Sequence, residues 1–181
     1  MRISGAVADV SQSADVERML GIALKSFGRV DILVNNAGIF PPHPNFPEMG
    51  VEYWDRVMAV NLRGLFLCSE VIGKHMIAQK QGGKIVNMSS IAGVKTFEHA
   101  LLVYATAKAG ILHCTRVCAR LLAPHGIRVN AIVPGSIDTE GIASKGPPRV
   151  TADTIPLGRR GKPDDIARSV LFLVSDMAEY I

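Results

Sequence analysis

Short apolar runs alternate with longer amphipathic stretches along this chain, and each apolar run ends at a polar or small residue. The nearly continuous apolar runs cover 6–8, 32–34, 84–88 and 128–133. Runs of this length are typical of strands that are buried on both faces. The pattern therefore predicts four strands of a sheet that is covered on both sides.

Amphipathic stretches fall between and after these strands. Their apolar residues recur with helical spacing and predict helices over 16–27, 53–79, 103–122 and 163–174. Gly28 ends the first of these helices, and the turn Pro124-His125-Gly126 ends the third. Because strands that alternate with helices build a parallel sheet, we expect a three-layer, doubly wound α/β sheet of the Rossmann-like kind. Residues 1–181 contain no linker or repeat and are expected to form one domain.

The composition, with 48% hydrophobic and 20% charged residues, fits a soluble globular domain. The net charge of +4 comes from scattered basic residues, which argues against a nucleic-acid partner. No apolar run approaches the roughly 20 residues that span a bilayer, so no membrane partner is expected. The first residues lack the apolar segment of a signal peptide, and we expect a cytoplasmic protein.

Three cysteines, Cys68, Cys114 and Cys118, lie in apolar helical stretches. Their odd number and their setting favour reduced, buried thiols. His113 next to Cys114 suggests a metal site as the alternative, but no second pair of ligands supports zinc. We therefore expect no metal.

Polar or small residues follow all four predicted strands. They are Asp9, Asn35, Ser89-Ser90 and Pro134-Gly135. In open parallel sheets, ligands bind beyond the carboxyl ends of the strands. The sequence therefore predicts a single site along that edge of the sheet.

Tyr104 and Lys108 lie four residues apart on a predicted helix, so their side chains share one face. A free tyrosine has a pKa near ~10, which a neighbouring cation lowers. A tyrosine tuned in this way can exchange a proton with an alcohol or carbonyl oxygen. The alternative is a packed tyrosine beside a solvated lysine.

Five motifs strengthen the catalytic interpretation. In chain order they are Asn35-Asn36-Ala37-Gly38, Asn61, Ser89-Ser90, Tyr104-Ala105-Thr106-Ala107-Lys108 and Pro134-Gly135. Together they resemble the short-chain dehydrogenase/reductase family over essentially the whole chain. The resemblance implies an oxidoreductase that interconverts an alcohol and a carbonyl by hydride transfer with NAD or NADP. A secondary alcohol, a sugar, a steroid and a 3-oxoacyl thioester all remain open as the small-molecule substrate.

The resemblance also implies catalytic roles. Tyr104 is the expected acid/base, and Ser90 is expected to polarise the substrate oxygen. Lys108 would lower the pKa of Tyr104 and hold the nicotinamide ribose. Asn61 would accompany a local helix distortion that holds a water in the proton relay, with a buried Asn that bridges two helical turns as the alternative. Within the serine pair, turn or helix capping fits Ser89 better than Ser90.

Further residues are expected, by resemblance, to bind the cofactor together with Tyr104 and Lys108. Asp9 and Val10 match the position beside the adenine, although an Asp that precedes a helix start at Ser11 or Ser13 is the alternative. The remaining positions are Asn36, Ala37 and Gly38 on the adenosine side, and Pro134, Gly135, Ile137 and Thr139 at the nicotinamide carboxamide.

Both ends of the family pattern are missing from the sequence. No Gly-x-Gly-x-x-Gly or Gly-x-x-x-Gly-x-Gly loop precedes the motifs, and such a loop holds the pyrophosphate. We therefore expect a sheet that is incomplete at both ends and a segment that does not turn over substrate by itself. A truncated, non-catalytic binding or scaffold protein is the alternative. The choice between NAD and NADP rests on a strand end that is absent, so it stays open.

The predicted helices over 53–79 and 103–122 are apolar on more than one face. Leu65-Phe66-Leu67 and Val71-Ile72 exceed what a sheet covers from one side. Relatives pair these helices between subunits, so the resemblance implies a homodimer or homotetramer. Burial within one subunit is the alternative. The loops over 39–50, 95–103 and 140–150 are expected to shape the substrate pocket.

Overall fold

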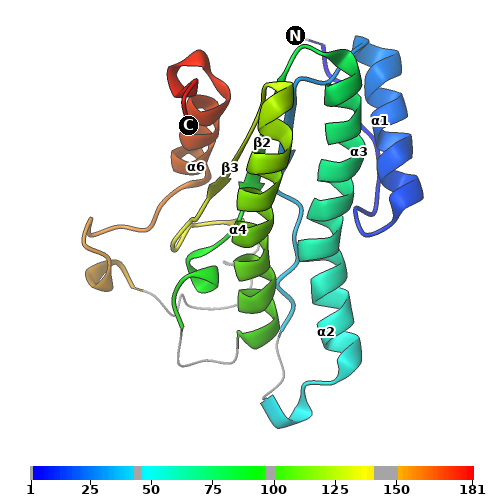
Figure 1. Ribbon diagram of the computed structural model, residues 1–181. Helices are drawn as coiled ribbons and strands as arrows, with labels where there is room; N and C mark the ends of the chain where they lie inside the picture. The colour runs from blue at the N-terminus through cyan, green and yellow to red at the C-terminus, as the bar shows by residue number, and fades with distance from the viewer. Residues whose placement is uncertain (1, 43–45, 97–100, 141–150) are drawn as a thin grey trace.

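The computed structural model describes residues 2–42, 46–96, 101–140 and 151–181. Its core is a parallel sheet with helices on both faces (Figure 1). The strands are β1 (Ile32–Asn35), β2 (Gly83–Met88) and β3 (Ile127–Ile132). The α-helices are α1 (Ser13–Phe27), α2 (Val51–Met58), α3 (Gly64–Gln79), α4 (Leu102–Leu122) and α6 (Pro163–Val174). The π-helical turn η2 (Ala59–Arg63) joins α2 to α3, and the 3₁₀ turns are η1 (Phe46–Glu48), η3 (Ile91–Gly93), η4 (Ala123–His125), η5 (Ala152–Thr154) and η6 (Asp176–Ala178).

The strands lie in the order β1-β2-β3, and both pairs are parallel. Ile32 faces Lys84 across the first pair, and Gly83 faces Ile127 across the second. The central strand β2 is buried along its length except at Lys84. Three of the four predicted strands are therefore confirmed, and their carboxyl ends meet at one edge.

The prediction of a strand at 6–8 is wrong. This segment has no strand geometry, and Val7 is 91% exposed. A strand forms only when a neighbour supplies hydrogen bonds, and among the described residues no strand lies beside this segment. It is held instead by α1, because the Arg18 guanidinium donates to the Val7 carbonyl at 2.9 Å.

Helices α3 and α4 cover one face of the sheet, and α1 packs against α3 (Figure 1). The main core joins Ile72 and Met76 of α3 to Ile85, Ile127 and Val129 of the strands. Successive strand residues point to opposite faces of a sheet. Because Ile127 and Val129 face the main core, Arg128 between them lies on the opposite face of the sheet. There its guanidinium donates to the last carbonyls of α6, which places α6 on that second face.

The second face is covered over β2 and β3 but not over β1. Ile32 and Val34 on this side of β1 are 45% and 40% exposed, whereas Leu33 on the other side packs against the main core. The predicted three-layer arrangement is therefore confirmed, with its second helical layer present only in part.

The helix predicted over 53–79 runs from α2 through η2 into α3. The π-helical turn Ala59–Arg63 widens this long helix at one point, and such turns are frequent at functional sites. The other helix ends agree with the sequence: Gly28 and Gly126 adopt left-handed conformations with φ of 83° and 69°. Among the described residues, no helix is both long and apolar enough to cross a membrane.

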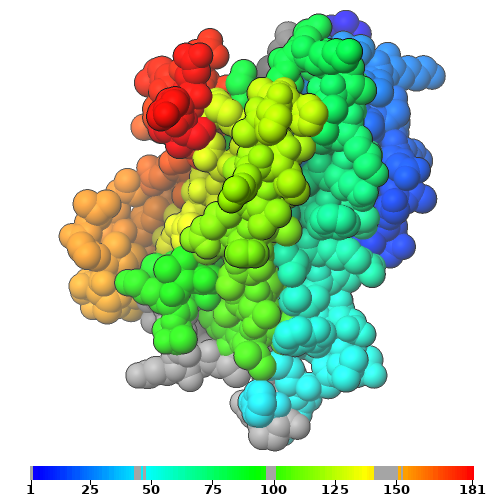
Figure 2. All heavy atoms as spheres, viewed as in Figure 1, coloured from blue at the N-terminus to red at the C-terminus, as the bar shows by residue number. Residues whose placement is uncertain are grey.

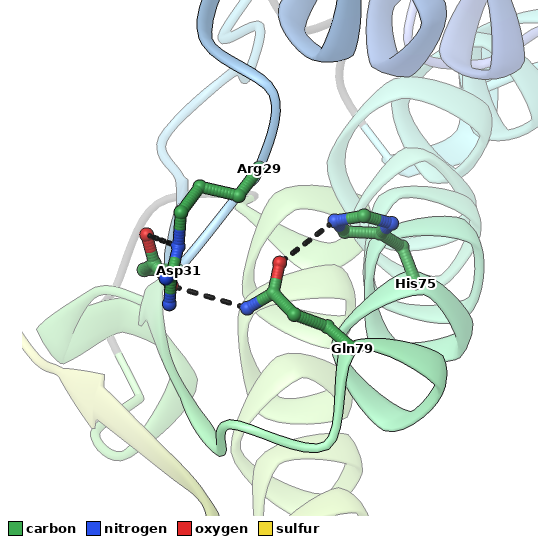
Figure 3. Close-up of polar contacts among 4 residues, drawn as sticks. All are labelled: Arg29, Asp31, His75 and Gln79. Atoms are coloured by element: carbon green, nitrogen blue, oxygen red, sulfur yellow. Dashed lines mark hydrogen bonds and ion pairs between the residues drawn. The ribbon is translucent and has the colours of Figure 1, made fainter.

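A cluster of polar side chains lies at the amino end of β1, the end opposite to the predicted site (Figure 3). Arg29 pairs with Asp31, and the Gln79 amide donates to the same carboxylate at 3.1 Å. His75 and Gln79 form a further hydrogen bond of 3.1 Å. The guanidinium of Arg29 lowers the pKa of Asp31. These contacts tie the end of α3 to the start of β1.

Candidate active site

The carboxyl end of β2 carries the serine pair. The Ser89 N–H donates to the Ile132 carbonyl at 2.9 Å, and Ile91 donates to the Pro134 carbonyl at the same distance. Ser90 is the N-cap of η3, where its Oγ accepts from the Ala92 N–H at 3.2 Å. The expectation that capping fits Ser89 better is therefore wrong, since Ser89 is buried and its hydroxyl bonds to α4 instead.

Tyr104 and Lys108 share one face of α4, as their spacing predicts. The Lys108 side chain is buried, with 6% exposed, and its ammonium donates to the Met88 carbonyl at 2.8 Å. The same Nζ lies 5.6 Å from the centre of the Tyr104 ring. The Phe40 ring centre is 4.8 Å from that of Tyr104, and the two rings are tilted by 57°. The half-buried Tyr104 ring therefore contacts both an ammonium and an apolar ring.

The protonation of this pair differs from the expectation. Burial raises the pKa of Tyr104, and a hydrogen bond with the Ser90 side chain lowers it by less. The expectation of a lowered Tyr104 pKa is therefore wrong in its net direction, because burial outweighs the interactions that lower this pKa. The Lys108 ammonium donates to the Met88 carbonyl. Burial also lowers the pKa of Lys108 to about 8. At neutral pH, Tyr104 is a protonated phenol beside a charged lysine.

Asn61 lies in the π-helical turn, which confirms the expected helix distortion. Its side chain is 1% exposed and binds the main chain of Ile39 twice: the amide donates at 2.8 Å, and Oδ1 accepts at 2.7 Å. A Cβ on Gly38 would lie 3.1 Å from Asn61 Oδ1 and 3.8 Å from Lys108 Nζ. Asn61 therefore bridges to the loop after β1, rather than between two helical turns, and holds that loop beside Lys108.

Asn35 and Asn36 face different surroundings. Asn35 is buried, and its amide donates to Asn87 Oδ1 at 2.8 Å and to Ser69 Oγ at 3.0 Å. Asn87 in turn donates to Thr115 Oγ1 at 2.9 Å. This network links α3 to α4 through β1 and β2. It was not predicted, although the Asn inside the apolar run of β2 was a usable signal. Asn36, Ala37 and Gly38 are exposed at the carboxyl edge.

Asp9 has a local role before a helix start, which is the expected alternative to a position beside the adenine. Its carboxylate accepts from the Ser11 N–H at 2.9 Å, and this bond lowers the pKa of Asp9. The turn that it forms precedes α1, which begins at Ser13. Val10 packs against the start of α3, because a Cβ on Gly64 would lie 2.7 Å from Val10 Cγ2. Among the described residues, no hydrogen bond joins Asp9 to Ser90, Tyr104 or Lys108.

The segment after β3 is fixed by the segment before α6. Ile137 and Gly161 form a parallel bridge, and the Asp138 N–H donates to the Gly161 carbonyl at 2.8 Å. Arg160 Nη2 donates to the Ile137 carbonyl at 3.1 Å, and its Nε lies 2.8 Å from Asp138 as an ion pair without hydrogen-bond alignment. Thr139 is exposed beyond the bridge. Of the expected pocket loops, residues 43–45, 97–100 and 141–150 lie outside the described residues.

The structure therefore brings together the side chains of Asn61, Ser90, Tyr104 and Lys108 with Gly38. A buried ammonium, a protonated phenol and a hydroxyl meet beyond the carboxyl end of β2. This arrangement can donate hydrogen bonds and a proton to an oxygen atom. The described residues contain no group of three or more His, Cys, Asp or Glu that could hold a metal ion.

Comparison with known proteins gives consistent results along the chain. A family model described as enoyl-(acyl carrier protein) reductase matches residues 2–181. The chain is 38% identical to an L-rhamnose 1-dehydrogenase (NAD(P)(+)) of Azotobacter vinelandii, over 96% of this chain and 69% of that protein. It is 40% identical to an NAD-dependent glycerol dehydrogenase of Listeria innocua, over 96% and 68%.

Solved structures agree. A Burkholderia xenovorans protein described as a short-chain dehydrogenase/reductase superposes with a TM-score of 0.89 at 34% identity, over 98% of this chain and 69% of its own. A short chain dehydrogenase of Mycobacterium smegmatis gives a TM-score of 0.85 at 30% identity, over 99% and 67%. The chain therefore belongs to the short-chain dehydrogenase/reductase family of oxidoreductases.

Proposed function

We propose that the protein interconverts a small-molecule alcohol and a carbonyl compound by hydride transfer with NAD or NADP. The observation that carries the proposal is the Tyr104 phenol, which lies next to Ser90 and beside the buried ammonium of Lys108. These groups lie at the sheet edge where open parallel sheets bind ligands. The relatives named above act on a sugar and on a polyol by their names, which makes hydroxylated compounds the first substrates to test.

The residues at this edge fit a nicotinamide nucleotide. An ammonium has three donors, and among the described residues the Lys108 ammonium donates only to Met88, so two can hold ribose hydroxyls. The absence of a side chain on Gly38 leaves room next to that ammonium. The cofactor supplies or accepts the hydride when bound. Its other expected contacts are Asp9, Val10, Asn36 and Ala37 on the adenosine side, and Pro134, Gly135, Ile137 and Thr139 at the carboxamide.

In the direction of carbonyl reduction, Ser90 donates a hydrogen bond to the substrate oxygen as negative charge develops there. Tyr104 then gives its proton to that oxygen, and its protonated state at neutral pH suits this step. The charge of Lys108 stabilises the phenolate that remains. In the direction of oxidation, the same phenol oxygen takes the proton back. Asn61 holds the turn and the loop that flank Lys108.

A direct test is a spectrophotometric screen of the complete gene product that carries residues 1–181. Sugars, polyols, hydroxysteroids and 3-oxoacyl thioesters are each offered with NAD(H) and NADP(H), and nicotinamide absorbance is followed. The proposal expects turnover of at least one class. If no class is turned over and neither nucleotide binds in a calorimetric titration, the proposal fails and a non-catalytic role replaces it.

The rate of carbonyl reduction is expected to fall as the pH rises through about 8. Burial lowers the pKa of Lys108 to about 8, so its charge is present below this pH and lost above it. Burial raises the pKa of Tyr104, so the phenol keeps its proton in this range. The check is kcat/KM for reduction between about pH 6 and about pH 10. A profile that stays flat to the alkaline end would contradict this assignment.

We further propose that the protein forms a homodimer or homotetramer through α2–α3 and α4, which lie side by side in Figure 2. Leu65 and Ile72 are buried within the subunit, so they are not available for a contact between subunits. Phe66 remains 50% exposed, and it lines a surface hollow together with Leu62 and Val117. Large apolar side chains grouped in this way are typical of contacts between subunits.

Phe66→Glu is expected to shift the complete gene product toward the monomer, because a charge would be buried in the contact. Sedimentation velocity measures the change. Phe27→Glu is a matched control, since Phe27 is an exposed aromatic residue at the far end of α1. Equal sedimentation of Phe66→Glu and the unmodified protein would exclude this face as the contact.

A further inference from the structure

We propose that Ser89 is a positioning residue that holds α4, and with it Tyr104 and Lys108, at a fixed height against the end of β2. The inference rests on the proposed function for its catalytic consequence. Its physical basis is a reciprocal pair of hydrogen bonds between Ser89 and Lys108 and their neighbours. Ser89 itself does not touch the reacting atoms.

The two bonds run in opposite directions between the same segments. Ser89 Oγ donates to the Lys108 carbonyl at 2.8 Å, and Lys108 Nζ donates to the Met88 carbonyl at 2.8 Å. Each segment therefore offers a side chain to the main chain of the other. Both Ser89 and Lys108 are buried, so water does not readily replace either bond.

A close main-chain approach supports the same turn of α4. A Cβ on Gly93 would lie 2.7 Å from the Ala109 nitrogen and from the Lys108 carbonyl carbon. The turn η3 therefore rests directly on α4 at Lys108–Ala109. Ser90 lies between Ser89 and η3, so the segment that carries it is fixed against α4 on both sides. Tyr104, which lies next to Ser90, is one helical turn before Lys108.

The bond from Ser89 is not needed to satisfy the carbonyl that receives it. Within a helix, the Lys108 carbonyl is placed to accept from the N–H four residues later. The Ser89 hydroxyl thus adds a second donor to that oxygen and fixes its direction relative to β2. Loss of this bond would free the Lys108 turn to shift and admit water beside the ammonium.

Ser89→Ala is expected to lower kcat for carbonyl reduction by about 10-fold, because the proton donor is displaced from the substrate oxygen. KM for the carbonyl substrate is expected to change by less than about 3-fold, since no substrate contact is removed. Ser89→Cys, which keeps a weak donor of similar size, is expected to recover part of kcat. Ser69→Ala is the matched control: Ser69 is a buried serine on α3 that accepts from Asn35.

A second readout does not depend on turnover. The titration of Lys108 is followed by NMR of protein carrying labelled lysine, with Tyr104 as the titratable neighbour that faces it. Ser89→Ala is expected to move the Lys108 midpoint upward from about 8, because the ammonium becomes better solvated. Ser69→Ala should leave the midpoint in place.

The two proposals fail in different ways. If the unmodified protein shows no turnover, the proposed function fails, and the lysine titration still tests the positioning role. If Ser89→Ala lowers only the melting temperature, as Ser69→Ala does, with kcat and the Lys108 midpoint unchanged, Ser89 has a purely structural role and the inference is overturned.

Discussion

Tyr104→Phe is expected to lower kcat for both oxidation and reduction by about 10² to 10⁴-fold, the range for loss of a positioned acid/base group. The phenol is the proton donor in the proposed reaction, and the ring without its hydroxyl keeps the contact with Phe40. Binding of NAD or NADP should change little, because the ring still occupies its place. Steady-state kinetics and a nucleotide titration of the complete gene product measure the two effects.

Tyr180→Phe is the control for this change. Tyr180 is fully exposed near the end of the chain and far from α4 in the sequence. Its variant should match the unmodified protein in kcat and in nucleotide affinity. Activity of Tyr104→Phe within 3-fold of the unmodified protein would remove Tyr104 from the mechanism.

Lys108→Met is expected to abolish activity while it stabilises the fold. The pKa of this lysine falls from 10.5 to about 8 by burial, which corresponds to roughly 3 kcal/mol of unfavourable free energy for the charged form. Part of this gain is offset, because the Met88 carbonyl loses a hydrogen bond worth about 1 to 2 kcal/mol. A net rise of about 1 to 2 kcal/mol in the free energy of unfolding should appear in denaturant titrations at neutral pH.

The pH dependence of this stabilisation has a defined sign. Between about 8 and 10.5 the unfolded chain keeps the lysine proton while the folded protein loses it, so the stability of the unmodified protein rises with pH. The advantage of Lys108→Met should therefore shrink over this range. Lys74→Met is the control, because Lys74 is exposed and pairs only with Glu70 in the described structure. A Lys108→Met protein that is less stable than the unmodified one at neutral pH would show that the buried ammonium does not destabilise the fold.

Local signals in the sequence were sufficient for most of the fold. The helix over 163–174 was predicted with the bounds of α6, and Gly28 and Gly126 end their segments as expected. These features depend on residues near one another in the chain. The strand expected at 6–8 failed, because pairing depends on a neighbour that the local pattern does not reveal.

The site shows the same division. The shared face of Tyr104 and Lys108 follows from helical spacing and was predicted. The link from Asn61 to Ile39 spans 22 residues and has no local signal. The same holds for the bond from Ser89 to the Lys108 carbonyl, across 19 residues. The upward shift of the Tyr104 pKa was also not predicted, because its largest cause is burial by segments that are distant in the sequence.

The proposed reaction transfers a hydride at an alcohol or carbonyl carbon, with Tyr104 as the proton donor. The most direct measurement uses reduced nicotinamide nucleotide in which both hydrogens at carbon 4 are replaced by deuterium, offered with a carbonyl substrate from the screen. The unmodified protein should form an alcohol with one deuterium at the former carbonyl carbon, and Tyr104→Phe should form it far more slowly. A product that gains no deuterium, or equal rates for the two proteins, would contradict the proposed reaction.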